Sequence, residues 1–296
     1  MLNVIKSKWI CLGISLVIIL AGVVSFFIQG FNLDIDFTGG TTITVDMEGK
    51  TFDIADAEKL ISDTLGFKAS NVQKADGNLL INISADGKAL SPEQRESLFA
   101  AIKTKYVLSE TNDPSFDSID PTIGKELRQS AILSCIIALI LMLAYITFRF
   151  DLSSGLAAVL SLAHNVFVLL AIYTIFQLNI NTTFIAAILT IVGYSINDTI
   201  VTFDRIREIG RKVRKTPFSA IANMGVNETV TRSIFTSVTT LLTIVVLYVI
   251  GVTSIKEFAL PIIVGIIVGT YSSIFIASPL WAMFKKDKVQ TSNNNK

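Results

Sequence analysis

The sequence predicts a polytopic α-helical membrane protein with six transmembrane helices and one α+β domain outside the membrane. Of its 296 residues, 51% are hydrophobic and 17% are charged, whereas a soluble domain carries about 25% charged residues. The apolar residues are collected in six runs, at 9–28, 130–148, 155–176, 183–203, 232–250 and 258–281. Each run is close to the length of about 20 residues that crosses a bilayer. Between the first two lies a long polar stretch, residues 30–128.

The first run is expected to be a retained membrane anchor. It follows Lys6 and Lys8, as the apolar core of a signal peptide would. It is longer than the roughly 7–15 residues of such a core, and no small-residue cleavage site follows it. We therefore assign residues 1–29 to the N-terminus and first helix, 129–284 to the other five helices, and 285–296 to a tail.

The distribution of basic residues predicts the orientation. Basic residues follow the second, fourth and sixth runs: Arg149, Arg205, Arg207, Arg211, Lys212, Arg214, Lys215, Lys285, Lys286 and Lys288. The loops on the opposite side, 177–182 and 251–257, contain Lys256 as their only basic residue. Because short cytoplasmic loops are rich in Lys and Arg, we expect both termini and the basic loop 204–231 in the cytoplasm. Residues 30–128 are then extracytoplasmic, and the membrane is the cytoplasmic (inner) membrane.

Residues 30–128 are expected to form a ferredoxin-like domain. Apolar and polar residues alternate over 42–47, and apolar residues recur at helical spacing over 53–67. A hairpin of 72–75 and 79–83 follows, around the Asp76-Gly77-Asn78 turn signal. Ser91, followed by Pro92 and Gln94, is typical of a helix start, and 116–119 is a last strand. The order β-α-β-β-α-β is that of a ferredoxin-like unit.

Asp198 is the first candidate functional residue, because it stands within the fourth apolar run. A carboxylate inside a membrane costs roughly 2.5–3.5 kcal/mol and is usually functional. Tyr194 and Ser195, one helical turn earlier, are both able to hydrogen-bond it, and they and Asn197 are predicted supporting residues. Burial opposes the charged form of a carboxyl and a nearby cation favours it, so such a group can exchange a proton near neutral pH. A residue that only bonds its helix neighbours is the alternative.

Arg232, at the start of the fifth run, is the expected partner of Asp198, since it lies at a similar depth. The alternative is a positive charge that only anchors the helix end. The same run is rich in hydroxyls, for most of which helix packing is the expected role, with a wet path for protons as the alternative. They are Thr231, Ser233, Thr236, Ser237, Thr239, Thr240 and Thr243. His164 is expected to donate a hydrogen bond between helices, with a proton relay as the alternative. Gly265 and Gly269 form a GxxxG pattern, which indicates a close helix contact and a face that needs a partner.

The sequence contains no sign of a metal site, a cofactor or an enzyme. It has a single His and no CxxC, and Cys11 and Cys135 both lie in apolar runs, so neither zinc nor a disulfide framework is indicated. Gly39-Gly40 is a backbone turn without the spacing of a phosphate-binding loop. An intramembrane aspartyl protease needs two facing carboxylates, and only Asp198 lies deep. We expect no nucleic-acid partner.

Two stretches resemble the SecF family of protein-export membrane proteins, which is related to the RND transporters. They are Phe37-Thr38-Gly39-Gly40-Thr41 and the block 193–208 around Asp198; the local sequences of Arg149 and Arg232 and the six-helix layout also fit. The resemblance implies pairing with SecD. It implies that the pair uses a proton or sodium gradient to pull exported, unfolded polypeptides outward after SecA has pushed them through SecYEG.

The resemblance also implies that the essential intramembrane Asp and Arg of the family are Asp198 and Arg232. Many relatives have His-Asp where this chain has His164-Asn165, so an Asp at that position is not required here. Two other functions stay open. One is half of an RND-type exporter of small molecules or lipids, although such exporters usually carry both halves in one chain. The other is a structural assembly factor without ion coupling, for which neutralising Asp198 would be harmless.

Overall fold

The structure is a computed structural model that describes residues 3–69, 71–75, 77–84, 90–213 and 216–285. Within these residues, six helical spans are long and apolar enough to cross a membrane. They are α1 (Val4–Gln29), α5 (Pro121–Arg149), α6 (Leu152–Ile175), α7 (Thr182–Lys212), α8 (Phe218–Ile250) and a last span, Thr253–Phe284. The predicted polytopic helical membrane protein is confirmed. Arg214, Lys215 and nearly all of the expected tail 285–296 fall outside the described residues.

The last span is composite, and the helices around the basic segment are longer than expected. α9 (Thr253–Ser272) leads through a π-helical turn, η1 (Ser273–Ala277), into α10 (Ser278–Phe284). α7 continues to Lys212 and α8 begins at Phe218, so most of 204–231 is helical rather than a loop. A helix can continue beyond its apolar residues when ion pairs between charged side chains stabilise the added turns. Arg205 pairs with Glu208 and with Glu228 of α8, and Lys212 also pairs with Glu208.

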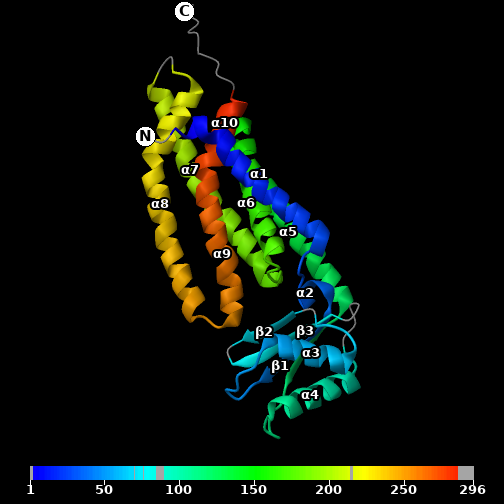
Figure 1. The fold of residues 1–296 in the computed structure, drawn as a ribbon. Helices are drawn as coiled ribbons and strands as arrows, with labels where there is room; N and C mark the ends of the chain where they lie inside the picture. Colours follow the sequence, from blue (N-terminus) through cyan, green and yellow to red (C-terminus); the bar gives the residue numbers. More distant parts are fainter. Residues whose placement is uncertain (1–2, 70, 76, 85–89, 214–215, 286–296) are drawn as a thin grey trace, which may run out of the picture.

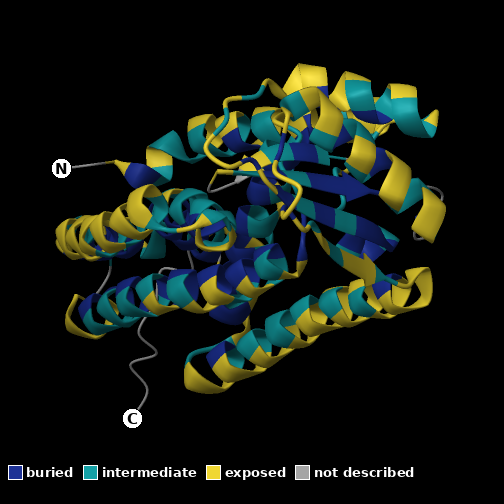
Figure 2. Ribbon diagram, turned by 90° about the horizontal axis from the view of Figure 1, so that it is seen from below, coloured by how far each residue is buried: buried dark blue, intermediate teal, exposed yellow. Residues whose placement is uncertain are grey.

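The centre of the helical bundle is made by α6, α7 and the last span. About half of the apolar window of each is buried (50%, 44% and 56%), against 11%, 6% and 11% for α1, α5 and α8. In Figure 2 the outward faces of the outer helices are largely exposed. A Cβ added to Gly265 of α9 would lie 2.3 Å from Ile191 Cδ1 of α7, and one on Gly269 would lie 3.2 Å from Ser195 Oγ. The expected close contact therefore exists, but it is made to α7 of the same chain, so these glycines leave no face for a partner.

The polar stretch folds into a four-stranded antiparallel sheet with two helices. Its elements are β1 (Gly40–Asp46), α3 (Ile54–Leu65), β2 (Asn71–Ala75), β3 (Asn78–Ile83), α4 (Pro92–Tyr106) and β4 (Ser115–Ile119). The strands lie in the order β2-β3-β1-β4, and β1 pairs with both β3 and β4. The apolar core of this domain lies between the sheet and the two helices, and its buried residues include Ile43, Val45, Ile61, Leu79, Ile81 and Leu98.

Local sequence explains how these elements begin. The Ser91 side chain accepts from the Gln94 backbone N–H at 3.3 Å, and Gln94 Oε1 accepts from the Ser91 N–H at 3.0 Å. This is the capping box that the sequence predicts. The single-turn helix α2 (Ile35–Thr38), which is capped by Asp34 and connects α1 to β1, was not predicted.

Figure 1 shows the arrangement of the whole chain. The long helices run side by side, and the sheet domain lies at one end of the bundle, joined to it through α2 and α5. The start of α1 and the end of α10 lie at the opposite end of the bundle.

Candidate functional site

Asp198 lies half-buried on α7, where it connects three segments of the bundle. Ser233 Oγ of α8 donates a hydrogen bond to Asp198 Oδ1 at 2.5 Å. Ser273 Oγ, in the π-turn η1, donates to the other carboxylate oxygen, Oδ2. Both serines are buried, with exposed fractions of 1% and 0%. Each oxygen of the carboxylate is therefore bound by a hydroxyl from a different helix.

The two helix neighbours that are able to bond Asp198 make their hydrogen bonds elsewhere. Tyr194 donates from its hydroxyl to Thr240 Oγ1 of α8 at 3.3 Å. Ser195 Oγ accepts from Asn165 Nδ2 of α6 at 2.8 Å. These bonds connect α7 to α8 and to α6. The described hydrogen bonds to the Asp198 carboxylate come instead from Ser233 and Ser273. One helical turn brings side chains near each other without aiming their polar atoms at one another.

Arg232 does not form the expected ion pair with Asp198 among the residues that the structure describes. Its neighbour Ser233 faces the carboxylate instead. With 3.6 residues per turn, adjacent positions point about 100° apart, so both side chains cannot face one group. Arg232 is exposed and lines a cavity of about 430 Å³. The other residues around this cavity are Val201, Asp204, Arg205, Glu208, Glu228 and Thr229.

The remaining predicted residues lie around this centre without bonding Asp198. His164 Nδ1 is 3.3 Å from Asn165 Oδ1, the next residue of the same helix, so the expected bond between helices is absent from the described contacts. Its Nε2 is buried without a partner in the described structure. Asn197 is exposed on α7. Sequence reasoning named Ser233 only as one of many hydroxyls and missed Ser273. The nearby Thr270, Ser272 and Ser273 in an apolar run were the available signal.

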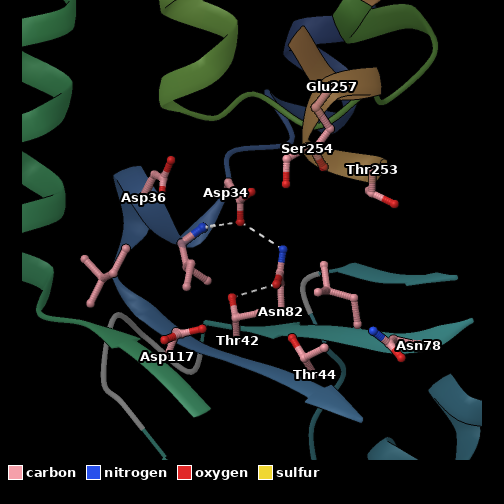
Figure 3. A pocket seen from close by; sticks show the side chains of 13 residues that line it. Asp34, Asp36, Thr42, Thr44, Asn78, Asn82, Asp117, Thr253, Ser254 and Glu257 are labelled. Atoms are coloured by element: carbon pink, nitrogen blue, oxygen red, sulfur yellow. Dashed lines mark hydrogen bonds between the residues drawn. The ribbon is translucent and has the colours of Figure 1, made fainter. Parts of the chain in front are cut away.

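A second polar cluster joins the sheet domain, called the outer domain from here on, to the bundle. Asp34 accepts from the Ile35 N–H at 2.7 Å, from Asn82 Nδ2 of β3 at 2.9 Å and from Asn179 Nδ2 at 2.6 Å. Figure 3 shows Asp34 between the sheet and the start of α9. Burial raises the pKa of the Asp34 carboxyl, and the charge of Asp36 acts in the same direction.

Further bonds in this cluster reach the outer ends of α7 and α9. Asp36 Oδ2 accepts from the backbone N–H of Thr182 at 2.9 Å and from its hydroxyl at 2.6 Å. Glu257 of α9 accepts from Asn181 Nδ2 at 2.6 Å. The cluster borders a cavity of about 360 Å³. Within the described residues, no group of three His, Cys, Asp or Glu side chains is arranged to hold a metal ion.

Comparison with known proteins identifies the family. The model of the C-terminal region of protein export membrane proteins SecD/SecF matches residues 100–287, and that of the SecD/SecF GG motif matches residues 24–50. The chain belongs to the SecD/SecF family. The predicted resemblance is therefore confirmed.

Relatives named protein translocase subunit SecF match along nearly their whole length. The one from Petrotoga mobilis is 36% identical over 93% of this chain and 92% of its own. The one from Sebaldella termitidis is 38% identical over 100% of this chain and 96% of its own. The crystal structure of SecDF from Thermus thermophilus, described as a translocon-associated membrane protein, is 36% identical with a TM-score of 0.84. That match covers 96% of this chain and 38% of the longer SecDF chain.

The SecD/SecF GG motif has a clear geometric role in this chain. Gly39 and Gly40 have φ values of 72° and 145°, which side-chain-bearing residues rarely adopt. A Cβ on Gly39 would lie 2.7 Å from Pro121 Cα at the start of α5. One on Gly40 would lie 2.3 Å from the Ile83 carbonyl oxygen of β3. The motif thus lets the residue before β1 pack against the start of α5, and lets the first residue of β1 pack against β3.

Proposed function

We propose that this chain is a SecF-type subunit of the protein translocase, which works with SecD and uses an ion gradient to drive late steps of protein export. The observation that carries the proposal is the position of Asp198, held by hydroxyls of two other segments within a membrane-spanning bundle. The names of the full-length relatives support the same function.

In the proposed mechanism, Asp198 and Arg232 are the ion-coupling residues. In the present arrangement the carboxylate is held by Ser233 and Ser273. A hydrogen bond to a charged group contributes about 1.5–3 kcal/mol, so loss of the charge on Asp198 weakens both links. Arg232 stands in the neighbouring cavity, one residue from Ser233. It pairs with the carboxylate in a second arrangement of the helices, and the ion gradient drives the exchange between the two.

The polar cluster at the outer end of the bundle transmits this exchange to the outer domain. Asp36 binds Thr182 at the start of α7, the helix that carries Asp198. The backbone of the linker also binds the loop before α7, with Asp34 N–H donating to the Ile180 carbonyl at 3.0 Å. We propose that the outer domain, residues 30–128, is ferredoxin-like, which the strand order β2-β3-β1-β4 supports. It holds an exported, unfolded polypeptide in one state and releases it in the other.

Pairing with SecD is supported by two observations. Relatives from Thermus thermophilus and Bacillus subtilis are named protein translocase subunit SecDF, and this chain matches 36% of each. Arg232 and Asn197 are exposed within membrane-spanning helices, where lipid cannot satisfy a charge or an amide. A partner helix from SecD can satisfy both. SecYEG, with SecA in the pathway, is the further proposed partner.

The proposed orientation places both termini in the cytoplasm and residues 30–128 outside, in the cytoplasmic (inner) membrane. The basic residues support it, because α5 ends at Arg149, α7 ends at Lys212 and Lys285 follows α10. These helix ends lie at the end of the bundle away from the sheet domain (Figure 1). Positive residues mark the cytoplasmic side of a membrane protein. The domain division is the one predicted above, with helix replacing most of the loop 204–231.

The deciding experiment measures export of a reporter protein into membrane vesicles after the ATP-driven step, with a proton or a sodium gradient imposed. Asp198→Asn and Arg232→Ala should each abolish the stimulation by the gradient and leave co-purification with SecD intact. Asp113→Asn, in an exposed loop of the outer domain, is the matched control and should behave as wild type. Full stimulation in Asp198→Asn would favour the structural assembly factor. Gradient-driven transport of a small molecule or lipid without any effect on protein export would favour the RND-type exporter.

A further inference from the structure

The last span contains a local break in helical geometry at the depth of Asp198. α9 ends at Ser272, and the next five residues, Ser273–Ala277, form the π-turn η1 before α10 begins. π-turns are rare and are often found at functional sites. The boundary between α9 and this turn falls between two adjacent serines, Ser272 and Ser273. Ser272 Oγ donates back to the Gly269 carbonyl of its own helix at 3.0 Å, whereas Ser273 Oγ reaches Asp198.

The Ser273 hydroxyl has two acceptors within reach. One is Asp198 Oδ2, and the other is the Thr270 carbonyl oxygen at 3.1 Å. A serine hydroxyl has one proton to donate and two lone pairs that accept. It can therefore donate to only one of these oxygens at a time. The Ser233 hydroxyl, on the other side of the carboxylate, has Asp198 as its acceptor in the described contacts.

We propose that Ser273 is a positioning residue that responds to the charge of Asp198 and passes that state to the last helix. The inference rests on the proposed ion coupling at Asp198. When Asp198 is ionised, the Ser273 hydroxyl donates a hydrogen bond to Oδ2. When a proton from the gradient occupies Oδ2, Asp198 donates to Ser273 Oγ, and the Ser273 hydroxyl turns to the Thr270 carbonyl. Ser273 keeps its own proton throughout, and only the direction of its O–H bond changes.

The acceptor in the second state belongs to a residue that also contacts α8. The Thr270 and Ser237 hydroxyls are 2.5 Å apart. Two routes therefore lead from Asp198 to α8: directly through Ser233, and through Ser273, Thr270 and Ser237. The Thr270 hydroxyl also donates to the Ile266 carbonyl at 2.8 Å, and the Thr270 carbonyl is a separate group of the same residue. A change at Ser273 therefore reaches the Ser237 contact through the position of the Thr270 backbone.

The test compares Ser273→Ala with the matched control Ser272→Ala in the intact complex with SecD. Both variants remove one buried hydroxyl from adjacent positions, but only the first removes a contact of Asp198. Ser273→Ala should lower gradient-driven export roughly tenfold, which corresponds to about 1.4 kcal/mol, and leave the ATP-driven step unchanged. Ser272→Ala should retain gradient-driven export.

A spectroscopic measurement separates this role from a loss of packing. The infrared bands of the Asp198 side chain are identified as those missing in Asp198→Asn. They should shift in Ser273→Ala, because the carboxylate loses a donor and the carboxyl loses an acceptor, and stay in place in Ser272→Ala. Unshifted bands, or equal loss of export in both serine variants, would overturn the inference. If Asp198→Asn itself kept its response to the gradient, the proposed function would fail instead.

Discussion

At the scale of single residues, Asp34 shows how one carboxylate can organise a junction. Its side chain caps α2 and binds Asn82 of the sheet and Asn179 of the loop before α7. The outer domain and the bundle therefore meet on one partly buried group. Burial disfavours its charged form more than the Ile35 and Asn179 donors favour it, and the charge of Asp36 acts in the same direction as burial, so the pKa of Asp34 is raised.

This raised pKa predicts a pH dependence of stability. In the unfolded chain, Asp34 loses its proton near pH 4, while the folded protein still holds it. The folded state then binds more protons than the unfolded state, so its stability falls as the pH rises through this window. Thermal midpoints of the wild type and Asp34→Asn, measured between about pH 4 and pH 7, should show the wild type losing its relative stability as the pH increases. A difference that is constant with pH, or that grows, would contradict the prediction. Asp113→Asn is the control.

Single residues also show what the sequence can predict about the candidate site. Asp198 was found because a charge within an apolar run is visible without knowledge of the fold. Its contacts were not, because they depend on the rotation and packing of helices far apart in the chain. Ser233 rather than Arg232 faces the carboxylate, and Ser273 is brought there by a π-turn that no local pattern signalled.

At the scale of elements, the contact between α7 and α9 brings the segments around Asp198 together. Gly265 lies against Ile191, whose side chain is itself buried. Hydropathy predicted the spans, and the capping residues around Ser91 predicted the start of α4 closely. The extent of α7 and α8 beyond their apolar runs was not predicted, because the ion pairs that stabilise those turns lie between helices as well as within them.

Replacing Gly265 should therefore disturb the bundle. The Cβ of Gly265→Val would come within 2.3 Å of Ile191 Cδ1, and overpacking of this kind costs about 1–3 kcal/mol. We expect a thermal midpoint lowered by several degrees in detergent. Gly13→Val is the control, because no atom lies within 4 Å of a Cβ built there. Equal midpoints for the two variants would show that α7 and α9 are not closely packed at this position.

At the scale of the whole molecule, the sheet domain and the basic ends of the helices lie at opposite ends of the bundle (Figure 1). The sequence predicted that the domain and the basic helix ends lie on opposite sides, because the basic residues of each short loop can be read from the sequence without knowledge of the fold. The pairing of the linker with the α6–α7 loop, including the bridge between Leu33 and Ile180, could not be predicted, because it joins segments far apart in the chain that carry no matching pattern.

The orientation can be tested with single cysteines in a chain without Cys11 and Cys135. Lys74→Cys lies on β2 of the outer domain, and Lys212→Cys lies at the end of α7 with an exposed side chain. A membrane-impermeant thiol reagent on intact cells should label only the first, and permeabilised cells should give labelling of both. Labelling of the second alone in intact cells would reverse the proposed orientation.

The close contacts at Gly39 and Gly40 also bear on how the gene can change. Every single-base change in a glycine codon that alters the amino acid adds a side chain or ends the chain. At these two positions any added Cβ meets backbone, at Pro121 and at Ile83. No codon that differs from a glycine codon by one base therefore encodes a tolerated replacement. Single-base mutations cannot replace either glycine without a steric clash.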